Sequence, residues 1–353
     1  MRAVTFTTPG EPLEIREVDE PELDETGVVV ETEACGICRS DWHAWQGDPL
    51  WEFRNFDDGH VFGHEPAGVV VEVGGEVEHV REGDRVTVPF NLGDGTCPSC
   101  RSGRSNICDN RVPLGLAPEA QGAFAERFYV PWADYNVVHL PDSVSSVEMA
   151  GLGCRFMTSF HALVHRADVT PGDWVVVYGC GGVGLSAVHI ADALGANVVA
   201  VDLFDEKLSF ASELGADETL NANDIADVPS AVRALTDGGA HVSVDALGIA
   251  ETCQNAVESL RKRGQHVQVG LTSNEEGGEV ALPTDRIVLN ELQFIGAVGM
   301  PRPRYDEIFR MMDRGALDPA AVISETVSLD QTPEILASMT DFDTVGIPVI
   351  DEF

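Results

Sequence analysis

Four stretches of this chain carry residue types that could bind a metal ion and a nucleotide. Three of them offer Cys38, His64 and Cys154 as sulfur and nitrogen donors. Two thiolates and an imidazole suit a catalytic Zn²⁺, which keeps three protein ligands and leaves one position for water or substrate. The fourth stretch, Gly179-Cys-Gly-Gly-Val-Gly184, has the spacing of a dinucleotide-binding loop. A metal ion and a nicotinamide together indicate hydride transfer next to the metal.

Each of these signals has another interpretation when it stands alone. Cys35 and Cys38 form a Cys-x-x-Cys pair, which also occurs in redox centres and zinc knuckles. Cys154 could be a small buried apolar residue, and a G-x-G-x-x-G pattern arises by chance in a chain with 35 glycines. The order in which the signals occur together is much harder to produce by chance, so we interpret them jointly.

The elements around these residues change in character along the chain. In the first half, short β-branched runs bounded by Gly and Asp predict strands over 27–33, 67–73 and 84–89. From about Thr170, predicted strands alternate with helical periods such as 183–194. The predicted strands of this second part are 173–178, 197–202, 241–245, 265–270 and 292–296. This alternation predicts a parallel, doubly wound α/β sheet.

Together these residues and motifs resemble the zinc-dependent medium-chain alcohol dehydrogenases over essentially all 353 residues. The resemblance implies an α/β protein in which a GroES-like irregular β-barrel catalytic domain accompanies a Rossmann cofactor domain. We expect the catalytic domain over 1–155, with a structural-zinc lobe at about 91–112. The NAD-binding domain is expected over 156–297, and residues 298–353 are expected to return to the catalytic domain.

The resemblance assigns roles around the catalytic metal. It implies Cys38, His64 and Cys154 as the zinc ligands. It implies Glu65 as the carboxylate beside the metal, which takes a ligand position in some members of the family. Asp41 matches the acid that hydrogen-bonds the ligating imidazole and fixes its tautomer.

A hydroxyl and an imidazole follow Cys38 at the spacing of the family's proton relay, on Ser40 and His43. Zinc lowers the pKa of a bound alcohol toward about 7. The proton must then leave a closed site, so a relay to solvent is chemically useful. The alternative for His43 is a surface or core histidine. We expect Cys35 to be structural, because a four-residue loop cannot easily place both of its thiolates on the metal beside the other two ligands.

A second metal lobe resembles the structural-zinc loop of the family, with one substitution. The family pattern C-x2-C-x2-C-x7-C falls on Asp94, Cys97, Cys100 and Cys108. A carboxylate can ligate zinc, so a Cys₃Asp site is expected. Such a site would bind zinc less tightly than Cys₄ and would hold the loop without taking part in the reaction.

The glycine loop is expected to bind the diphosphate of the cofactor. Its first glycine makes the tight turn, its second lets the backbone approach the diphosphate, and its third lets the helix pack on the strand. The N-terminus of the helix then offers N–H donors to the phosphates. The loop residues are Gly179, Gly181, Gly182, Val183 and Gly184.

Asp202 ends the next predicted strand, where an acid hydrogen-bonds the adenosine ribose. A 2′-phosphate would meet that negative charge, so NAD is expected, with NADP possible. The resemblance implies that Lys207 lies near the same ribose. Arg155 departs from the family, which commonly has Gly after that cysteine, and could reach a phosphate, a substrate carboxylate or only a surface acid. The resemblance also implies nicotinamide contacts from the backbone of Val269, Gly270 and Leu271.

The charge balance restricts the partners and the environment. The chain has 59 acidic residues against 22 Lys and Arg, a net charge of −37, and only two lysines. Nucleic-acid binding is excluded, because phosphate contacts require a basic face. The acids are spread from Glu11 to Glu352, and high salt screens their mutual repulsion. We therefore expect a halophilic protein, with a basic partner as the alternative.

The same composition predicts a cytoplasmic protein without a membrane partner. No apolar run of 18 residues occurs, and the N-terminal residues lack the pattern of a signal peptide. Most of the eight cysteines stand at metal-ligand spacing, which fits a reducing compartment.

The expected function is the interconversion of an alcohol and its aldehyde or ketone by hydride transfer to NAD, in a homodimer or homotetramer. A polyol or sugar dehydrogenase on the same scaffold is the nearest alternative. A zinc-free quinone or enoyl reductase would lack the Cys and His ligands, and a non-catalytic nucleotide sensor is a third class. Aromatic pocket candidates favour aliphatic or aromatic alcohols. These candidates are Trp42, Trp45, Trp51, Phe53 and Phe90.

Overall fold

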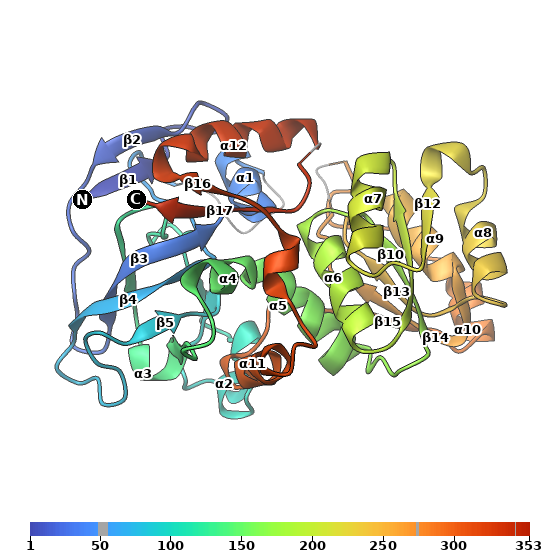
Figure 1. Ribbon diagram of the computed structural model, residues 1–353, viewed down its shortest axis with the longest axis horizontal. Helices are drawn as coiled ribbons and strands as arrows, with labels where there is room; N and C mark the ends of the chain where they lie inside the picture. Colours follow the sequence, from blue (N-terminus) through green and yellow to red (C-terminus); the bar gives the residue numbers. More distant parts are fainter. Residues whose placement is uncertain (49–55, 273–274, 343) are drawn as a thin grey trace. The chain divides into compact units, whose positions relative to one another are not determined.

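The structure is a computed structural model that describes residues 1–48, 56–272, 275–342 and 344–353 (Figure 1). The chain forms two compact units. Unit 1 contains Met1–Cys154 and Gly299–Phe353, and unit 2 contains Arg155–Val298. Within the described part of the chain, none of the helices is long and apolar enough to cross a membrane.

A seven-stranded sheet forms the centre of unit 1 and joins segments from both ends of the chain. Its strands follow the order β16-β17-β3-β4-β5-β9, and β8 also pairs with β3. β17 lies antiparallel to β3, with Ile350 opposite Cys35 and Val349 opposite Gly36. The bounds are β3 Val28–Gly36, β4 Pro66–Val73, β5 Arg85–Thr87, β8 Arg127–Val130, β9 Val138–His139, β16 Ile323–Ser328 and β17 Ile347–Glu352.

Strand β3 is buried at both ends and alternates between exposed and buried residues at its centre. Glu31 and Glu33 face solvent on either side of the buried Thr32, whereas Ala34, Cys35 and Gly36 are all buried. The strand is longer than the predicted 27–33 and delivers the chain to Cys38 inside the unit. Two short sheets complete the strands of unit 1, β1 Arg2–Thr5 with β2 Glu14–Glu17 and β6 Asn91–Leu92 with β7 Val112–Pro113.

The core of unit 1 contains apolar side chains from the sheet and from the chain segments that cross it, including Phe62, Phe124 and Phe128. Short helices surround this core. They are α1 Arg39–Gln46, α2 Pro98–Arg101, α3 Ala133–Asn136, α4 Ser146–Gly151, α11 Tyr305–Asp313 and α12 Thr332–Ser338.

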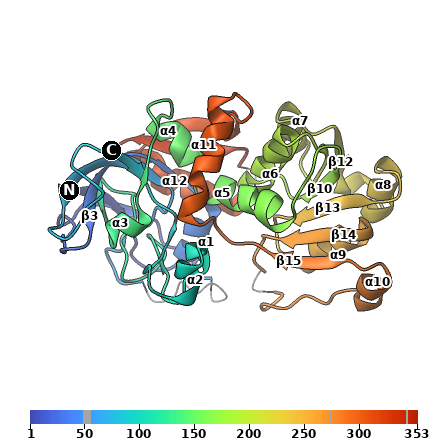
Figure 2. The same ribbon diagram turned by 90° about the horizontal axis from the view of Figure 1, so that it is seen from below.

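Unit 2 is built on a six-stranded parallel sheet in the order β12-β11-β10-β13-β14-β15. In chain order this is 3-2-1-4-5-6, the order of a doubly wound dinucleotide-binding fold, so the predicted parallel sheet is confirmed. Helices α6 and α7 pack together on one face, and α8 and α9 pack on the other (Figure 2). The strands are β10 Trp174–Tyr178, β11 Asn197–Asp202, β12 Glu218–Asn221, β13 Ala240–Asp245, β14 Leu260–Gln268 and β15 Gln293–Gly296. The helices are α6 Gly182–Ala193, α7 Asp205–Glu213, α8 Val228–Leu235, α9 Ala250–Glu258 and α10 Thr284–Leu289.

Helix α5, Cys154–Phe160, begins at the last residue of unit 1 and continues as a π-helix over His161–Arg166. Within unit 2, the hydroxyl of Ser159 donates a hydrogen bond to the carbonyl of Val183, at 2.8 Å. This bond fixes α5 against the first turn of α6.

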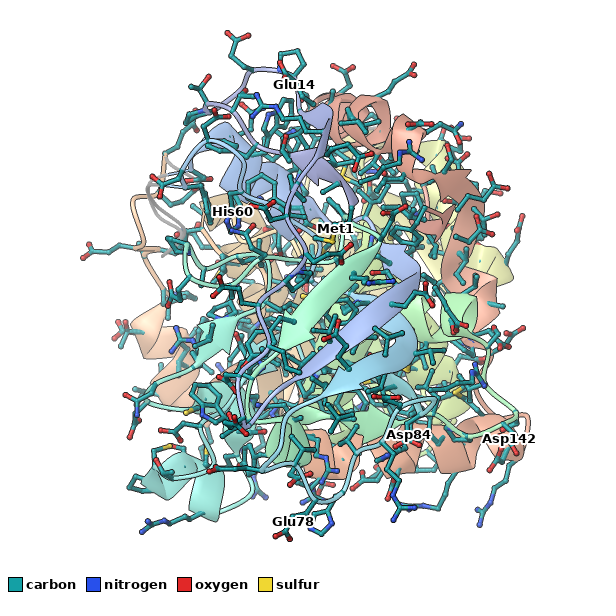
Figure 3. All side chains as sticks on the ribbon, turned by 90° about the vertical axis from the view of Figure 1, so that its left-hand side faces the viewer. Met1, Glu14, His60, Glu78, Asp84 and Asp142 are labelled. Atoms are coloured by element: carbon teal, nitrogen blue, oxygen red, sulfur yellow. The ribbon has the colours of Figure 1, made fainter. Side chains whose placement is uncertain are left out.

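Acidic side chains are distributed over the surface of unit 1 instead of forming one patch. Figure 3 shows Glu14, Glu78 and Asp142 pointing outward at different edges of the unit, and all three are exposed. This distribution agrees with the spread of acids along the sequence.

Candidate active site

Four side chains of unit 1 gather their donor atoms in one place. The thiols of Cys38 and Cys154, the imidazole of His64 and the carboxylate of Glu65 offer ligand atoms that all lie within 4.8 Å of one another. Cys38 follows β3 and caps α1, whereas His64 and Glu65 directly precede β4. Cys154 is the first residue of α5. Two adjacent antiparallel strands and one helix start therefore bring together residues that are distant in the sequence.

Asp41 connects the two loops that carry Cys38 and His64. Its Oδ1 lies 2.8 Å from Nδ1 of His64 and accepts a hydrogen bond from the backbone N–H of Gly63 at 3.0 Å. Its Oδ2 accepts from the backbone N–H of Cys38 at 3.1 Å. Asp41 is the third residue of α1 and forms a capping box with Cys38. One buried carboxylate therefore fixes the positions of both ligand loops.

The cluster has the chemistry of a metal site. With Nδ1 of His64 facing Asp41, Nε2 is left for the metal, and it is a buried nitrogen without a hydrogen-bond partner in the described part of the chain. Burial lowers the pKa of His64, but the negative charges of Asp41 and Cys38 outweigh burial and raise this pKa well above its ordinary value. Thiolates, an imidazole lone pair and surplus negative charge fit a zinc ion.

The other residues near the cluster take different positions. Glu65 is buried, and a Cβ at Gly153 would lie only 2.4 Å from the Cβ of Glu65, so glycine is required there. Cys35 is buried in β3 and does not belong to the donor cluster. The hydroxyl of Ser40 lies 3.8 Å from the sulfur of Cys38.

His43 lies on α1 with its Nδ1 3.1 Å from Oδ2 of Asp48. Burial and the charge of Arg39 lower the pKa of His43, against an opposing effect of Asp48. Asp48 was not predicted as a site residue, because only the turn that ends α1 brings it back to the imidazole. Helix α1 ends at Gln46, and Gly47 follows with φ of 69°.

The second predicted metal lobe also brings its four residues together. Donor atoms of Asp94, Cys97, Cys100 and Cys108 lie within 4.8 Å of one another. The backbone N–H of Cys100 donates to the sulfur of Cys97, and that of Asn110 donates to the sulfur of Cys108, both at 3.4 Å. Such bonds stabilise thiolates, so the lobe fits a bound metal.

Asp94 in this lobe is held as a carboxylate. Hydrogen bonds from the side chain of Asn110 and from Thr96 hold the pKa of Asp94 well below its usual range. Its Oδ1 lies 3.4 Å from the sulfur of Cys108. The position that carries cysteine in the family pattern therefore presents a charged oxygen donor here.

The glycine loop of unit 2 joins β10 to α6 with the geometry that its residues predicted. Gly179 has φ of +91°, a conformation that L side chains rarely adopt. A Cβ at Gly184 would lie 1.7 Å from the carbonyl oxygen of Gly179. A Cβ at Gly181 would meet no atom within 4 Å among the described residues, so the backbone is open on the side where a diphosphate would approach. The loop therefore fits a dinucleotide.

Asp202 occupies the end of β11, as predicted, and has a further structural role. Its Oδ2 accepts from the backbone N–H of Cys180 in the glycine loop at 2.6 Å. Its Oδ1 accepts from the backbone N–H groups of Leu203 and Phe204 at 2.7 and 3.1 Å. Lys207 is buried, with its ammonium 5.0 Å from the ring centroid of Phe204.

The predicted nicotinamide segment follows β14. The backbone N–H groups of Val269 and Gly270 donate to the carbonyl of Asp245 at 3.1 and 2.8 Å, and Leu271 is exposed. Sequence reasoning missed Asp245, a fully buried acid at the end of β13. Its carboxylate accepts from the backbone of Leu247 and Gly248 and from the side chain of Gln268. Its position at the end of a predicted strand was the available signal.

Comparisons with known proteins agree with this geometry. The chain matches the family model of the alcohol dehydrogenase GroES-like domain over residues 24–142, and that of the zinc-binding dehydrogenase over 182–314. It is 34% identical over 342 residues to an alcohol dehydrogenase of Geobacillus stearothermophilus, covering 96% of this chain and 95% of that protein. The chain belongs to the zinc-dependent medium-chain alcohol dehydrogenase family.

Other members of the family are similarly close over their full length. An NAD-dependent alcohol dehydrogenase of Sulfurisphaera tokodaii is 33% identical over 358 residues, with 99% of each chain covered. The structure of alcohol dehydrogenase TADH from Thermus sp. ATN1 aligns with a TM-score of 0.91 at 29% identity, covering 100% of both chains. The chain is therefore a zinc-dependent oxidoreductase that uses a nicotinamide cofactor, and its predicted GroES-like and Rossmann fold is confirmed.

Proposed function

We propose that this dehydrogenase interconverts an alcohol and its aldehyde or ketone at the cluster of Cys38, His64 and Cys154, with NAD as the preferred cofactor. The observation that carries the proposal is the gathering of these donors with Nε2 of His64, a buried nitrogen that has no hydrogen-bond partner among the described residues. Zinc bound there supplies a Lewis acid that lowers the pKa of an alcohol. Glu65 lies in the same cluster and would be the carboxylate beside the metal.

Ser40 and His43 are proposed to carry the alcohol proton outward. Ser40 lies beside the ligand Cys38, and His43 is half-buried on the same helix. The lowered pKa of His43 keeps its imidazole neutral at neutral pH, so that it can accept a proton. Asp48 orients the ring through Nδ1.

Asp202 supports NAD as the preferred cofactor. Its carboxylate is fixed at the end of β11 by three backbone N–H groups. A 2′-phosphate placed beside the adenosine ribose would be repelled by this charge. Lys207, with Val269, Gly270 and Leu271, is proposed to complete the cofactor contacts.

Asp94, Cys97, Cys100 and Cys108 are proposed to hold a structural zinc ion. The N–H···S bonds within the lobe support this role. The lobe closes on itself through Asn110 and Asp94, so the metal would fix a loop and would not take part in the reaction.

The substrate is proposed to be an aliphatic or aromatic alcohol. The ring of Phe90 lies 5.9 Å from the ring of His64, so it borders the metal cluster. Trp45 is buried and packs in the core of unit 1. Trp42 is half-buried and donates to Thr340. Trp51 and Phe53 lie outside the described residues.

A homodimer or homotetramer is proposed from the edge of the parallel sheet in unit 2. Strand β15 ends the strand order, and exposed apolar side chains occur on it and on the residues just before and after it in the chain. Phe294 is 42% exposed, Val298 45%, Val288 69% and Leu289 80%. Apolar surface at a strand edge is typical of subunit contacts.

A cytoplasmic location is proposed from the cysteines at metal-ligand spacing.

A substrate panel on the zinc-loaded protein at high salt tests the proposed reaction. Primary and secondary alcohols, polyols and sugars are each supplied with NAD or NADP, and reduction of the cofactor is followed. Turnover of simple alcohols with NAD is expected. A preference for polyols or sugars would replace the proposed substrate class, and absence of turnover despite bound zinc and NAD would contradict catalysis at this site.

A further inference from the structure

Neither the G-x-G-x-x-G motif nor the backbone conformation requires glycine at position 182 of the dinucleotide loop. Gly182 occupies a variable position of the G-x-G-x-x-G pattern, and its φ does not lie in the left-handed region. A Cβ at Gly182 would lie 2.5 Å from Cδ of Arg155 and 3.4 Å from its Nε and Nη1. The missing side chain therefore leaves the space through which Arg155 crosses the first turn of α6.

Helix α5 holds Arg155 in this position. Arg155 and Ser159 are four residues apart on α5, so they share one face of the helix. Ser159 donates to the carbonyl of Val183, which is in the same first turn of α6. Both residues lie in unit 2 with the glycine loop.

The charge of Arg155 is placed where an anion is needed. Its side chain is only 5% exposed, and it lies beside the N-terminus of a twelve-residue helix, which carries partial positive charge. A guanidinium and the partial positive charge of a helix N-terminus, close together and poorly solvated, favour the binding of an anion. This attraction is important in a protein of net charge −37, because the remaining charges repel a negatively charged cofactor.

We propose that Arg155 binds the diphosphate of the dinucleotide cofactor together with the first turn of α6. The inference rests on the proposed function only in taking the glycine loop as the cofactor site. Arg155 could contact a phosphate, a substrate carboxylate or a surface acid, and its position over Gly182 favours the phosphate. A guanidinium is suited to this role because it can give two parallel hydrogen bonds to phosphate oxygens.

Binding of cofactor fragments to zinc-loaded protein tests the proposal without measuring turnover. ADP-ribose contains the diphosphate, and adenosine does not. Arg155→Gln should weaken binding of ADP-ribose by about 10- to 100-fold in calorimetry and leave adenosine binding unchanged. Arg155→Lys should restore part of the affinity. Lys262→Gln removes the same charge from an exposed position of strand β14 in unit 2 and serves as the control.

A second variant tests the geometry directly. Gly182→Ala places a methyl group against Arg155, so it should weaken ADP-ribose binding strongly when Arg155 is present and much less in the Arg155→Gln background. Zinc content should be unchanged in every variant. Unchanged ADP-ribose affinity in Arg155→Gln would overturn the proposal, as would equal losses for ADP-ribose and adenosine, or additive effects in the double variant. A wild-type protein that binds ADP-ribose but turns over no alcohol would contradict the proposed function and leave this inference intact.

Discussion

Asp41 Oδ1 lies 2.8 Å from Nδ1 of His64, and its second oxygen accepts from the backbone of Cys38. A single buried carboxylate therefore orients one metal ligand and fixes the loop that carries another. Removing the charge of Asp41 should loosen the imidazole of His64 and the loop of Cys38 without removing a ligand atom of the metal.

Asp41→Asn should weaken zinc binding by about 10- to 100-fold, the range expected when the hydrogen-bond partner of a ligating histidine is changed. The measurement is retention of zinc against a chelator of known affinity. Asp48→Asn is the matched control, because Asp48 contacts His43 and not His64. Equal zinc retention in wild type and Asp41→Asn would show that Asp41 does not position the ligand.

Cys38→Ser and Cys154→Ser should each lose the catalytic zinc and nearly all turnover, because a neutral hydroxyl is a poor zinc ligand. Elemental analysis should fall by one zinc per chain. Cys35→Ser is the control, because Cys35 is buried near Cys38 but lies outside the donor cluster. Full zinc and activity in either ligand variant would remove that residue from the metal site.

Asp202→Asn should relax the preference for NAD over NADP by at least about fivefold in kcat/KM, because it removes repulsion of a 2′-phosphate. Asn retains an acceptor for the backbone N–H of Cys180, so the glycine loop should keep its conformation. Asp205→Asn, at the start of α7, is the control for general loss of charge. A wild-type enzyme that already prefers NADP would contradict this role of Asp202.

His60 should make the protein less stable in acid. Burial lowers its pKa to about 4, although the hydrogen bond to the carbonyl of Gly115 opposes this effect. An unfolded chain has the ordinary pKa of about 6.5, so between these values only the unfolded state takes up a proton. The free energy of unfolding should fall by about 3 kcal/mol as pH decreases through this window, and above pH about 6.5 His60 should have no effect.

His60→Gln should flatten this part of the pH dependence. The slopes of melting temperature against pH are compared between pH 7 and pH 4.5 for wild type, His60→Gln and the exposed-histidine control His139→Gln. Equal slopes in wild type and His60→Gln would exclude a neutral buried His60 as a source of acid sensitivity.

Folding and activity should require molar salt, because a net charge of −37 leaves acids repelling one another. The screening length falls from about 30 Å at 0.01 M salt to about 3 Å at 1 M. The melting temperature should rise strongly between 0.1 and 3 M KCl, and less with sucrose, which favours burial without screening charge. A melting temperature that does not change with KCl would contradict adaptation to high salt as the reason for the acidic composition and would favour a basic partner.

The sequence was sufficient for the parts of the fold that repeat a local pattern. β-branched runs predicted β3 and β4 within a few residues, and the glycine loop predicted the start of α6. Metal donors were predictable because only a few residue types bind zinc at such spacing. Tertiary contacts between distant positions were not predictable from the sequence. Helix α1 has only eight residues, and it begins where Cys38 and Asp41 form a capping box.

The same reason explains the other differences. The contact of Asp202 with Cys180, and the passage of Arg155 over Gly182, depend on how α5, α6 and β11 pack. Neither follows from spacing along the chain. The burial of Trp45 in the core of unit 1, with its indole N–H donating to the carbonyl of Glu11, is likewise a tertiary contact that its aromatic type does not reveal.

The pairing of β17 with β3 determines when the metal centre can form during synthesis. Val349 and Ile350 of β17 pair with Gly36 and Cys35, more than three hundred positions earlier in the chain. Unit 2 is continuous in sequence, so it can fold while synthesis is still in progress. The sheet that supports Cys38 must wait for β17, and its donors remain incompletely ordered until then. Loading with zinc should therefore follow the synthesis of β17 and its pairing with β3.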